Sequence, residues 1–114
     1  MKPSRFFPIC LSLAATMFAI APAVAQDANA GRNLAATCFT CHGTNGNSVG
    51  GIPPSLAGRD SGEVFQAMKE FQSGKRPATV MHQQARGYND AQLKLIAAYF
   101  ASIKPAAARL PAKP

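Results

Sequence analysis

The 114-residue sequence predicts an all-α fold of about three helices. Helix start and stop residues bracket three stretches of the chain, and no stretch alternates apolar and polar residues as a strand does. Hydrophobic residues make up 47% of the chain, but they are unevenly spread, with 17 of the 54 in its first 25 residues. The other 89 residues contain 21 hydrophobic side chains larger than alanine. So small an apolar set usually needs a metal, disulfides or another staple to fold alone.

Residues 1–25 have the features of a cleavable secretory signal. Lys2 and Arg5 provide a basic start, a mostly apolar run covers residues 6–20, and a small-residue cleavage pattern ends at Ala25. A retained membrane anchor is disfavoured because prolines and hydroxyl residues interrupt a run that should hold about 20 apolar residues. We therefore expect an exported, periplasmic protein with no membrane attachment after cleavage.

The first predicted helix runs from about Asp27, a suitable N-cap, to a pair of cysteines at positions 38 and 41. Gly31 lies inside it and weakens it by about 1 kcal/mol relative to alanine. We expect another helix to approach closely at this glycine, which would compensate for that cost. Residues 43–54, rich in Gly, Asn, Ser and Pro, are predicted to form turns.

The second predicted helix spans about Ser61 to Ser73. Asp60 or Ser61 is suited to cap its start, and Gly74 is suited to end it. Asp60 followed three residues later by Glu63 is typical of a capping box.

The third predicted helix runs from Asp90 to Ile103. Asn89 is suited to cap its start, apolar residues recur along one face, and Pro105 ends it. Residues 105–114 consist mainly of Pro, Ala, Arg and Lys, and we expect a disordered tail. A single domain over residues 26–104 remains, without internal repeats.

The cysteines of this domain carry the main chemical signal. Cys38 and Cys41 are two residues apart, and His42 follows at once. A disulfide enclosing two residues would restrict the unfolded chain little and so would stabilise the fold little. A thioredoxin-like redox pair needs strands that the sequence lacks. A zinc site would have to use His82 as well, with the adjacent Cys41 and His42 turned awkwardly onto one ion.

The Cys-x-x-Cys-His spacing instead indicates covalent attachment of a c-type haem. Two thiols at this spacing can bond the two vinyl groups on one edge of a porphyrin, and His42 then faces the iron as its proximal ligand. The segment occurs once in the sequence, so we expect one haem.

The opposite face of the iron has three candidate ligands. Met68 belongs to an apolar helical stripe and is expected to pack in the core, which leaves Met81 and His82. Met81 is favoured, because it follows Pro77 in a segment outside any convincing helix that can fold over the ring. His82 remains the rival, and two histidines would give a lower reduction potential. Several apolar residues either surround the haem or form ordinary core: Leu34, Phe39, Ile52, Leu56, Val64, Met68, Phe71 and Ile96.

The chain is basic, with a net charge of +7 that falls to +5 when Lys2 and Arg5 leave with the signal. The remaining basic residues are scattered, and an exported protein does not meet nucleic acid, so nucleic-acid binding is not expected. The excess of positive charge is compatible with a solvated surface or with binding to an acidic partner.

The sequence resembles the class I c-type cytochromes. The resemblance covers about residues 28–103 and rests on Cys38–His42, the Pro-x-Leu at Pro54–Leu56, Met81, and a C-terminal helix with Tyr99-Phe100. It implies the class I cytochrome c fold, with about three helices wrapped around one covalently attached haem.

The resemblance also assigns roles to individual residues. In this family the first and last helices cross, with a glycine of the first under an aromatic residue of the last; Gly31 and either Tyr99 or Phe100 fit those positions. A proline carbonyl in such cytochromes accepts a hydrogen bond from the proximal histidine, here that of Pro54, or of Pro53 if the register slips.

Further segments resemble one subgroup, the cytochrome subunit of flavocytochrome c sulfide dehydrogenase, which is close to cytochromes c4 and c553. In that subgroup the axial methionine falls at Met81. Some members carry two haem domains, whereas this chain has one. The resemblance implies an FAD-containing sulfide dehydrogenase flavoprotein as partner, which would hold the flavin. The segments are 41–50, 71–74, 79–81 and 85–88.

These features predict a non-enzymatic electron-transfer protein, since no nucleophile or general base stands in a recognisable arrangement. The favoured role is the electron-accepting cytochrome subunit of an FAD-containing sulfide dehydrogenase. The alternative is a freely diffusing periplasmic electron carrier to an oxidase or reductase. A third possibility is a haem sensor or peroxidase whose distal ligand dissociates.

Overall fold

The computed structural model describes residues 29–107, which form helices and loops without a strand. This confirms the predicted all-α class. Residues 1–28 and 108–114, which include the predicted signal, the Asp27 cap and most of the predicted tail, lie outside the described residues. Within the described part, no helix is long and apolar enough to cross a membrane. The α-helices are α1 (Ala30–Ala35), α2 (Phe39–His42), α3 (Ser61–Ser73), α4 (Met81–Arg86) and α5 (Asp90–Ser102).

The first helical segment is continuous from Ala30 to His42, because a short 3-10 turn, η1 (Ala36–Cys38), joins α1 to α2. It ends where Gly43 adopts a φ of +83°, a backbone conformation that favours glycine. A Cβ at this position would clash with the carbonyl group of Asn47. The chain therefore turns sharply right after His42 and enters a second 3-10 turn, η2 (Thr44–Gly46).

Helices α3 and α5 match their predicted bounds closely. The Asp60 side chain accepts a hydrogen bond from the Glu63 amide at 3.0 Å, and Gly74 ends α3 in the left-handed conformation. The start of α5 has a full capping box, in which the Asn89 and Gln92 side chains accept each other's backbone N–H groups at 2.9 Å. Helix α5 ends one residue before the predicted Ile103.

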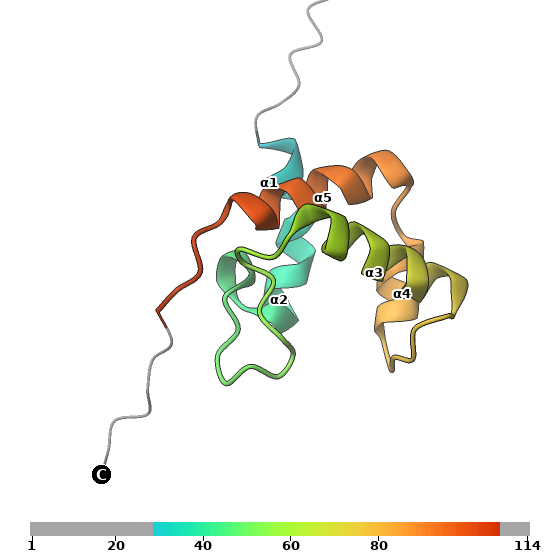
Figure 1. The fold of residues 1–114 in the computed structure, drawn as a ribbon, viewed down its shortest axis with the longest axis horizontal. Helices are drawn as coiled ribbons and strands as arrows, with labels where there is room; N and C mark the ends of the chain where they lie inside the picture. Colours follow the sequence, from blue (N-terminus) through green and yellow to red (C-terminus); the bar gives the residue numbers. More distant parts are fainter. Residues whose placement is uncertain (1–28, 108–114) are drawn as a thin grey trace, which may run out of the picture.

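Helix α4 corrects the prediction that Met81 lies outside any helix, because Met81 is its first residue. The helix is six residues long, and no side chain caps it at Val80. Isolated helices of this length are unstable in water, so packing must hold it. Figure 1 shows α4 beside α3, and residue contacts join the two helices.

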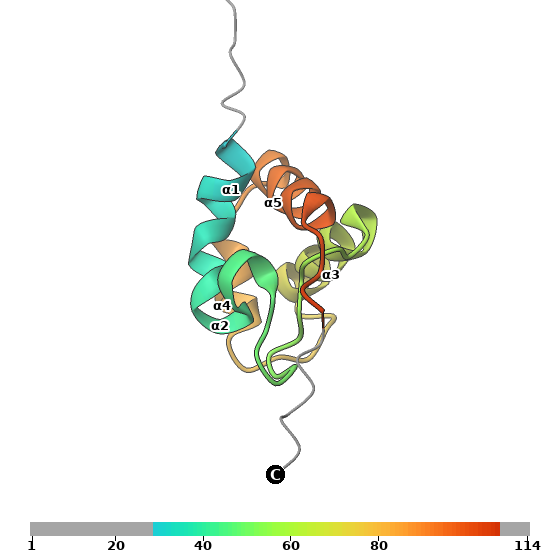
Figure 2. The ribbon, with the colours of Figure 1, turned by 90° about the vertical axis from the view of Figure 1, so that its left-hand side faces the viewer.

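The first and last helices cross, as predicted, and α5 lies between α1 and α3 (Figures 1 and 2). A Cβ on Gly31 would lie 2.7 Å from the Leu95 carbonyl oxygen and 3.2 Å from the Tyr99 Cβ. Tyr99 is therefore the aromatic residue over Gly31, whereas the Phe100 ring packs against Gly46. Met68 lies in the core, as predicted. The buried core cluster consists of Ala35, Met68, Ala85, Leu93, Ile96 and Phe100.

Replacing Gly31 with alanine should destabilise the haem-loaded protein by about 1–3 kcal/mol, because the new methyl group overpacks the helix crossing. Alanine elsewhere in a helix would stabilise it by up to about 1 kcal/mol, so the sign of the effect is diagnostic. Denaturant unfolding measures it. Gly87→Ala is the matched control, because that residue has a φ of −71° and its Cβ would meet nothing closer than 3.5 Å. A Gly31→Ala variant as stable as the wild type would contradict the close crossing.

Candidate haem-binding site

The two cysteines lie within one turn at the junction of η1 and α2. Both are free thiols, so the disulfide alternative does not describe them. Cys38 is half-buried and packs against the core cluster, and this burial raises the pKa of its thiol. Cys41 is exposed. No three Cys, His, Asp or Glu side chains of residues 29–107 gather around a possible metal position.

His42 is the last residue of α2, and its side chain is buried, with 8% exposed. Its Nδ1 atom lies 2.7 Å from the Pro54 carbonyl oxygen. Because a carbonyl oxygen only accepts, Nδ1 carries the ring hydrogen and donates it. In the neutral imidazole, Nε2 therefore keeps a free lone pair, as a histidine that binds a metal through this atom requires.

The loop that carries Pro54 is fixed by its own hydrogen bonds. The Ser55 hydroxyl accepts a hydrogen bond from the Ser48 amide at 2.9 Å, and the Gly46 carbonyl accepts one from the Leu56 amide at 2.8 Å. These bonds place the Pro54 carbonyl, rather than that of Pro53, against His42. The sequence analysis did not single out Ser55, because an isolated serine in a turn-rich loop gives no sign of which amide it will meet.

Met81 is half-buried and packs against the core cluster from α4. Its rival His82 has a structural contact: its Nε2 donates to the Arg76 carbonyl oxygen at 2.9 Å. The His82 ring also stands edge-on to Phe71, with ring centroids 6.2 Å apart. His82 therefore holds the loop that leads into α4. Met81 as the ligand stays a prediction.

The apolar residues predicted around the haem do not all lie inside. Met68, Val64 and Ile96 are buried, and Leu34, Phe39, Leu56 and Phe71 pack against the core cluster. Ile52 is 90% exposed and belongs to neither group.

These donors fit a c-type haem. Two reduced thiols stand on one turn, an imidazole is held in the tautomer that leaves Nε2 free, and a thioether lies on a separate helix. Figure 1 shows that α2 and α4 stand apart in the molecule, with His42 on one and Met81 on the other. An all-helical fold with this donor set is typical of small proteins that hold covalent haem.

The chain belongs to the cytochrome c family, and the family model described as cytochrome c matches residues 28–104. The resemblance to class I c-type cytochromes is thereby confirmed, and a cytochrome c domain implies a covalently bound c-type haem.

Three relatives illustrate the range of similar proteins. The chain is 40% identical over 73 residues to the cytochrome subunit of sulfide dehydrogenase from Chlorobaculum tepidum, covering 64% of this chain and 66% of the relative. It is 36% identical over 81 residues to cytochrome c-554(548) from Halomonas halodenitrificans, covering 68% and 98%. It is 41% identical over 80 residues to cytochrome c4 from Pseudomonas aeruginosa, covering 70% and 40%. The match thus spans just under two thirds of the sulfide dehydrogenase subunit and two fifths of cytochrome c4.

Proposed function

We propose that this chain is a periplasmic one-electron carrier with a single c-type haem. Cys38 and Cys41 form the covalent attachment, and His42 and Met81 are the axial ligands. When bound, the haem supplies an iron that cycles between its ferrous and ferric states. The observation that carries the proposal is the 2.7 Å contact between His42 Nδ1 and the Pro54 carbonyl, which leaves Nε2 free to bind iron.

The protein's residues bind and orient rather than react. The Pro54 carbonyl holds the His42 ring in one orientation and makes it a better electron donor. A thioether from Met81 favours the ferrous state and so raises the reduction potential. His42 and Met81 would together hold the iron through two side chains, which is the arrangement of an electron carrier rather than of an enzyme.

The proposed partner is the FAD-containing flavoprotein subunit of a sulfide dehydrogenase. The similarity to the Chlorobaculum tepidum cytochrome subunit supports this role. In it, the chain would accept one electron at a time from the reduced flavin and pass it on, while the flavin and the sulfide chemistry stay on the partner. Export through a signal at residues 1–25 would bring the chain to the same compartment as such a partner.

A freely diffusing periplasmic carrier is the second candidate. The similarity to cytochrome c-554(548) supports it, because the aligned residues cover 98% of that cytochrome. The two candidates differ in partner and not in chemistry. A haem sensor or peroxidase would differ in chemistry, since its distal ligand must leave the iron.

The test is expression with export in a host that matures c-type cytochromes. We expect an intact mass equal to residues 26–114 plus one haem, and a reversible redox titration with a one-electron slope. The ferrous protein should bind carbon monoxide slowly, because Met81 occupies the sixth position. A well-folded protein with the bare polypeptide mass would contradict haem attachment, and rapid carbon monoxide binding would favour the sensor or peroxidase.

Purification from the native organism under mild conditions separates the two carrier roles. Recovery of a stoichiometric flavoprotein with the cytochrome would support the sulfide dehydrogenase subunit. A monomer without flavin, whose reduction rate falls as salt is added, would support the diffusing carrier.

A further inference from the structure

The position of Met81 depends on contacts from outside its own helix. Helix α4 has six residues, no side-chain cap and no acidic residue in its first turn, so little in its own sequence stabilises it. Ala85 is its one buried residue and is fully inaccessible to solvent. Ala85 follows Met81 by four residues, so the two share one face of α4, and both contact the core cluster.

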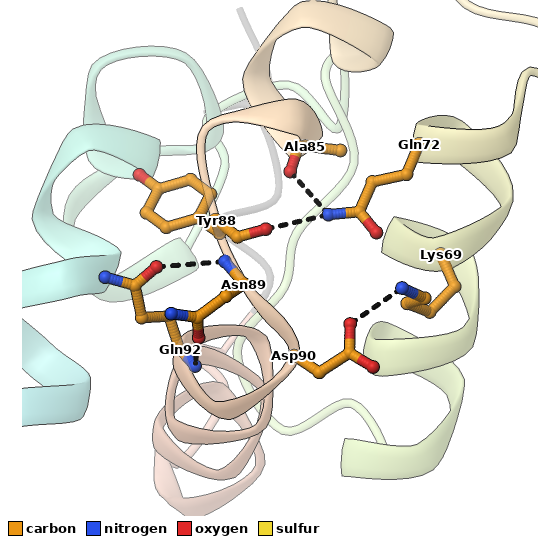
Figure 3. Close-up of polar contacts among 7 residues, drawn as sticks. All are labelled: Lys69, Gln72, Ala85, Tyr88, Asn89, Asp90 and Gln92. Carbon is orange, nitrogen blue, oxygen red and sulfur yellow. Dashed lines mark hydrogen bonds and ion pairs between the residues drawn. The ribbon is translucent and has the colours of Figure 1, made fainter.

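The Gln72 side chain of α3 bonds the backbone at the end of α4. The Gln72 Nε2 atom donates to the carbonyl oxygen of Ala85 at 2.9 Å and to that of Tyr88 at 2.8 Å (Figure 3). These carbonyls lie at the end of α4 and in the turn that leads to α5. Because one amide group binds both, it fixes how far α4 lies along α3 and how it is rotated about its own axis.

Two other contacts hold the same turn, but each is more exposed. The Lys69 ammonium, one turn before Gln72 on α3, lies 2.7 Å from the Asp90 carboxylate, with side chains 38% and 61% exposed. Exposed ion pairs of this kind contribute little. On the other side, the Tyr88 and Thr37 hydroxyls lie 2.6 Å apart, which links the turn to the residue before Cys38. The part-buried Gln72 amide is thus the main anchor on the α3 side.

We propose that Gln72 is a positioning residue for the axial ligand, acting through the backbone of α4 to hold the Met81 sulfur against the iron. The inference rests on the proposed function, since it takes Met81 as the ligand. The two hydrogen bonds of Gln72 set the place of the helix from which the ligand extends.

The test uses the haem-loaded protein and two variants of Gln72. Gln72→Leu removes both donors at similar size. Gln72→Glu keeps the shape but presents oxygen to two carbonyl oxygens. Gln66→Leu is the matched control, because Gln66 is exposed on the same helix and bonds only the Glu70 carboxylate. Two readouts report on the sulfur: the thioether-to-iron charge-transfer band at the red end of the ferric spectrum, and the affinity of added imidazole for the ferric iron.

We expect both Gln72 variants to weaken the band and to bind imidazole about tenfold more tightly (about 1.4 kcal/mol), with the control unchanged. Wild-type band and imidazole affinity in a folded Gln72→Glu variant would overturn the proposal, even if Gln72→Leu did not fold. Met81→Ala is measured in parallel. If it too leaves both readouts unchanged, the ligand assignment fails; if it alone changes them, only the role of Gln72 fails.

Discussion

The double variant Cys38→Ala/Cys41→Ala is expected to lose its haem on denaturing chromatography and to lose most of its stability. The reason is the small core of the described residues. Four of their nine buried hydrophobic residues are alanines, and the large, fully buried side chains are Phe100, Leu93 and Ile96. A core of this size does not stabilise a small domain without a bound group or a cross-link.

The size of the effect follows from binding linkage. A group present at a thousand times its dissociation constant stabilises a fold by about 4 kcal/mol. In a domain of this size, 1 kcal/mol corresponds to about 4–8 °C in the midpoint of thermal unfolding. We therefore expect the midpoint to fall by roughly 15 °C or more, measured by circular dichroism, with the bare polypeptide mass recovered after denaturation.

The single variants and a control refine the test. Cys41→Ala removes an exposed thiol, whereas Cys38→Ala also removes a side chain that packs against the core cluster, so the second should be the less stable. Thr40→Ala changes an exposed residue of the same turn and should keep both haem and stability. A double variant that retains haem through denaturing chromatography would refute covalent attachment at these cysteines.

The parts of the fold that could be predicted are those whose signals are local. The bounds of α3 follow from Asp60 at its start and Gly74 at its end, and the start of α5 follows from Asn89. In each case the residue that decides the boundary lies within three residues of the amide or carbonyl to which it is hydrogen-bonded. Its effect can therefore be predicted from the local sequence.

Helix α4 could not be predicted, because its main support comes from residues distant in the chain. Gln72 lies 13 residues before Ala85, and the Thr37 hydroxyl reaches Tyr88 across 51 positions. The window of α4 itself has no side-chain cap, and its apolar face consists of Met81 and Ala85 alone. The haem site shows the same division. Cys38, Cys41 and His42 form a local pattern, but which proline carbonyl meets the His42 ring depends on how the loop between them closes.

Met81→Ala should lower the reduction potential on the order of 0.1 V, within the span of about 0.8 V that axial ligands cover. The variant removes the soft, neutral thioether that favours the ferrous state. The same change should abolish the charge-transfer band and let carbon monoxide bind the ferrous protein rapidly, because no side chain then occupies the sixth position. Potentiometry and visible spectroscopy of the purified protein measure all three effects.

Two controls make the assignment decisive. Met68→Ala removes a methionine that is 7% exposed in the core, so it should cost about 2–5 kcal/mol of stability while the band and the potential stay unchanged. His82→Ala breaks the hydrogen bond to the Arg76 carbonyl and should loosen the preceding loop, again without loss of the band. If His82→Ala shifted the potential and Met81→Ala did not, the histidine would be the ligand. In that case His82 would have to bind through Nδ1, or through Nε2 after its bond to the Arg76 carbonyl breaks, since Nε2 cannot donate to a carbonyl and bind iron at once.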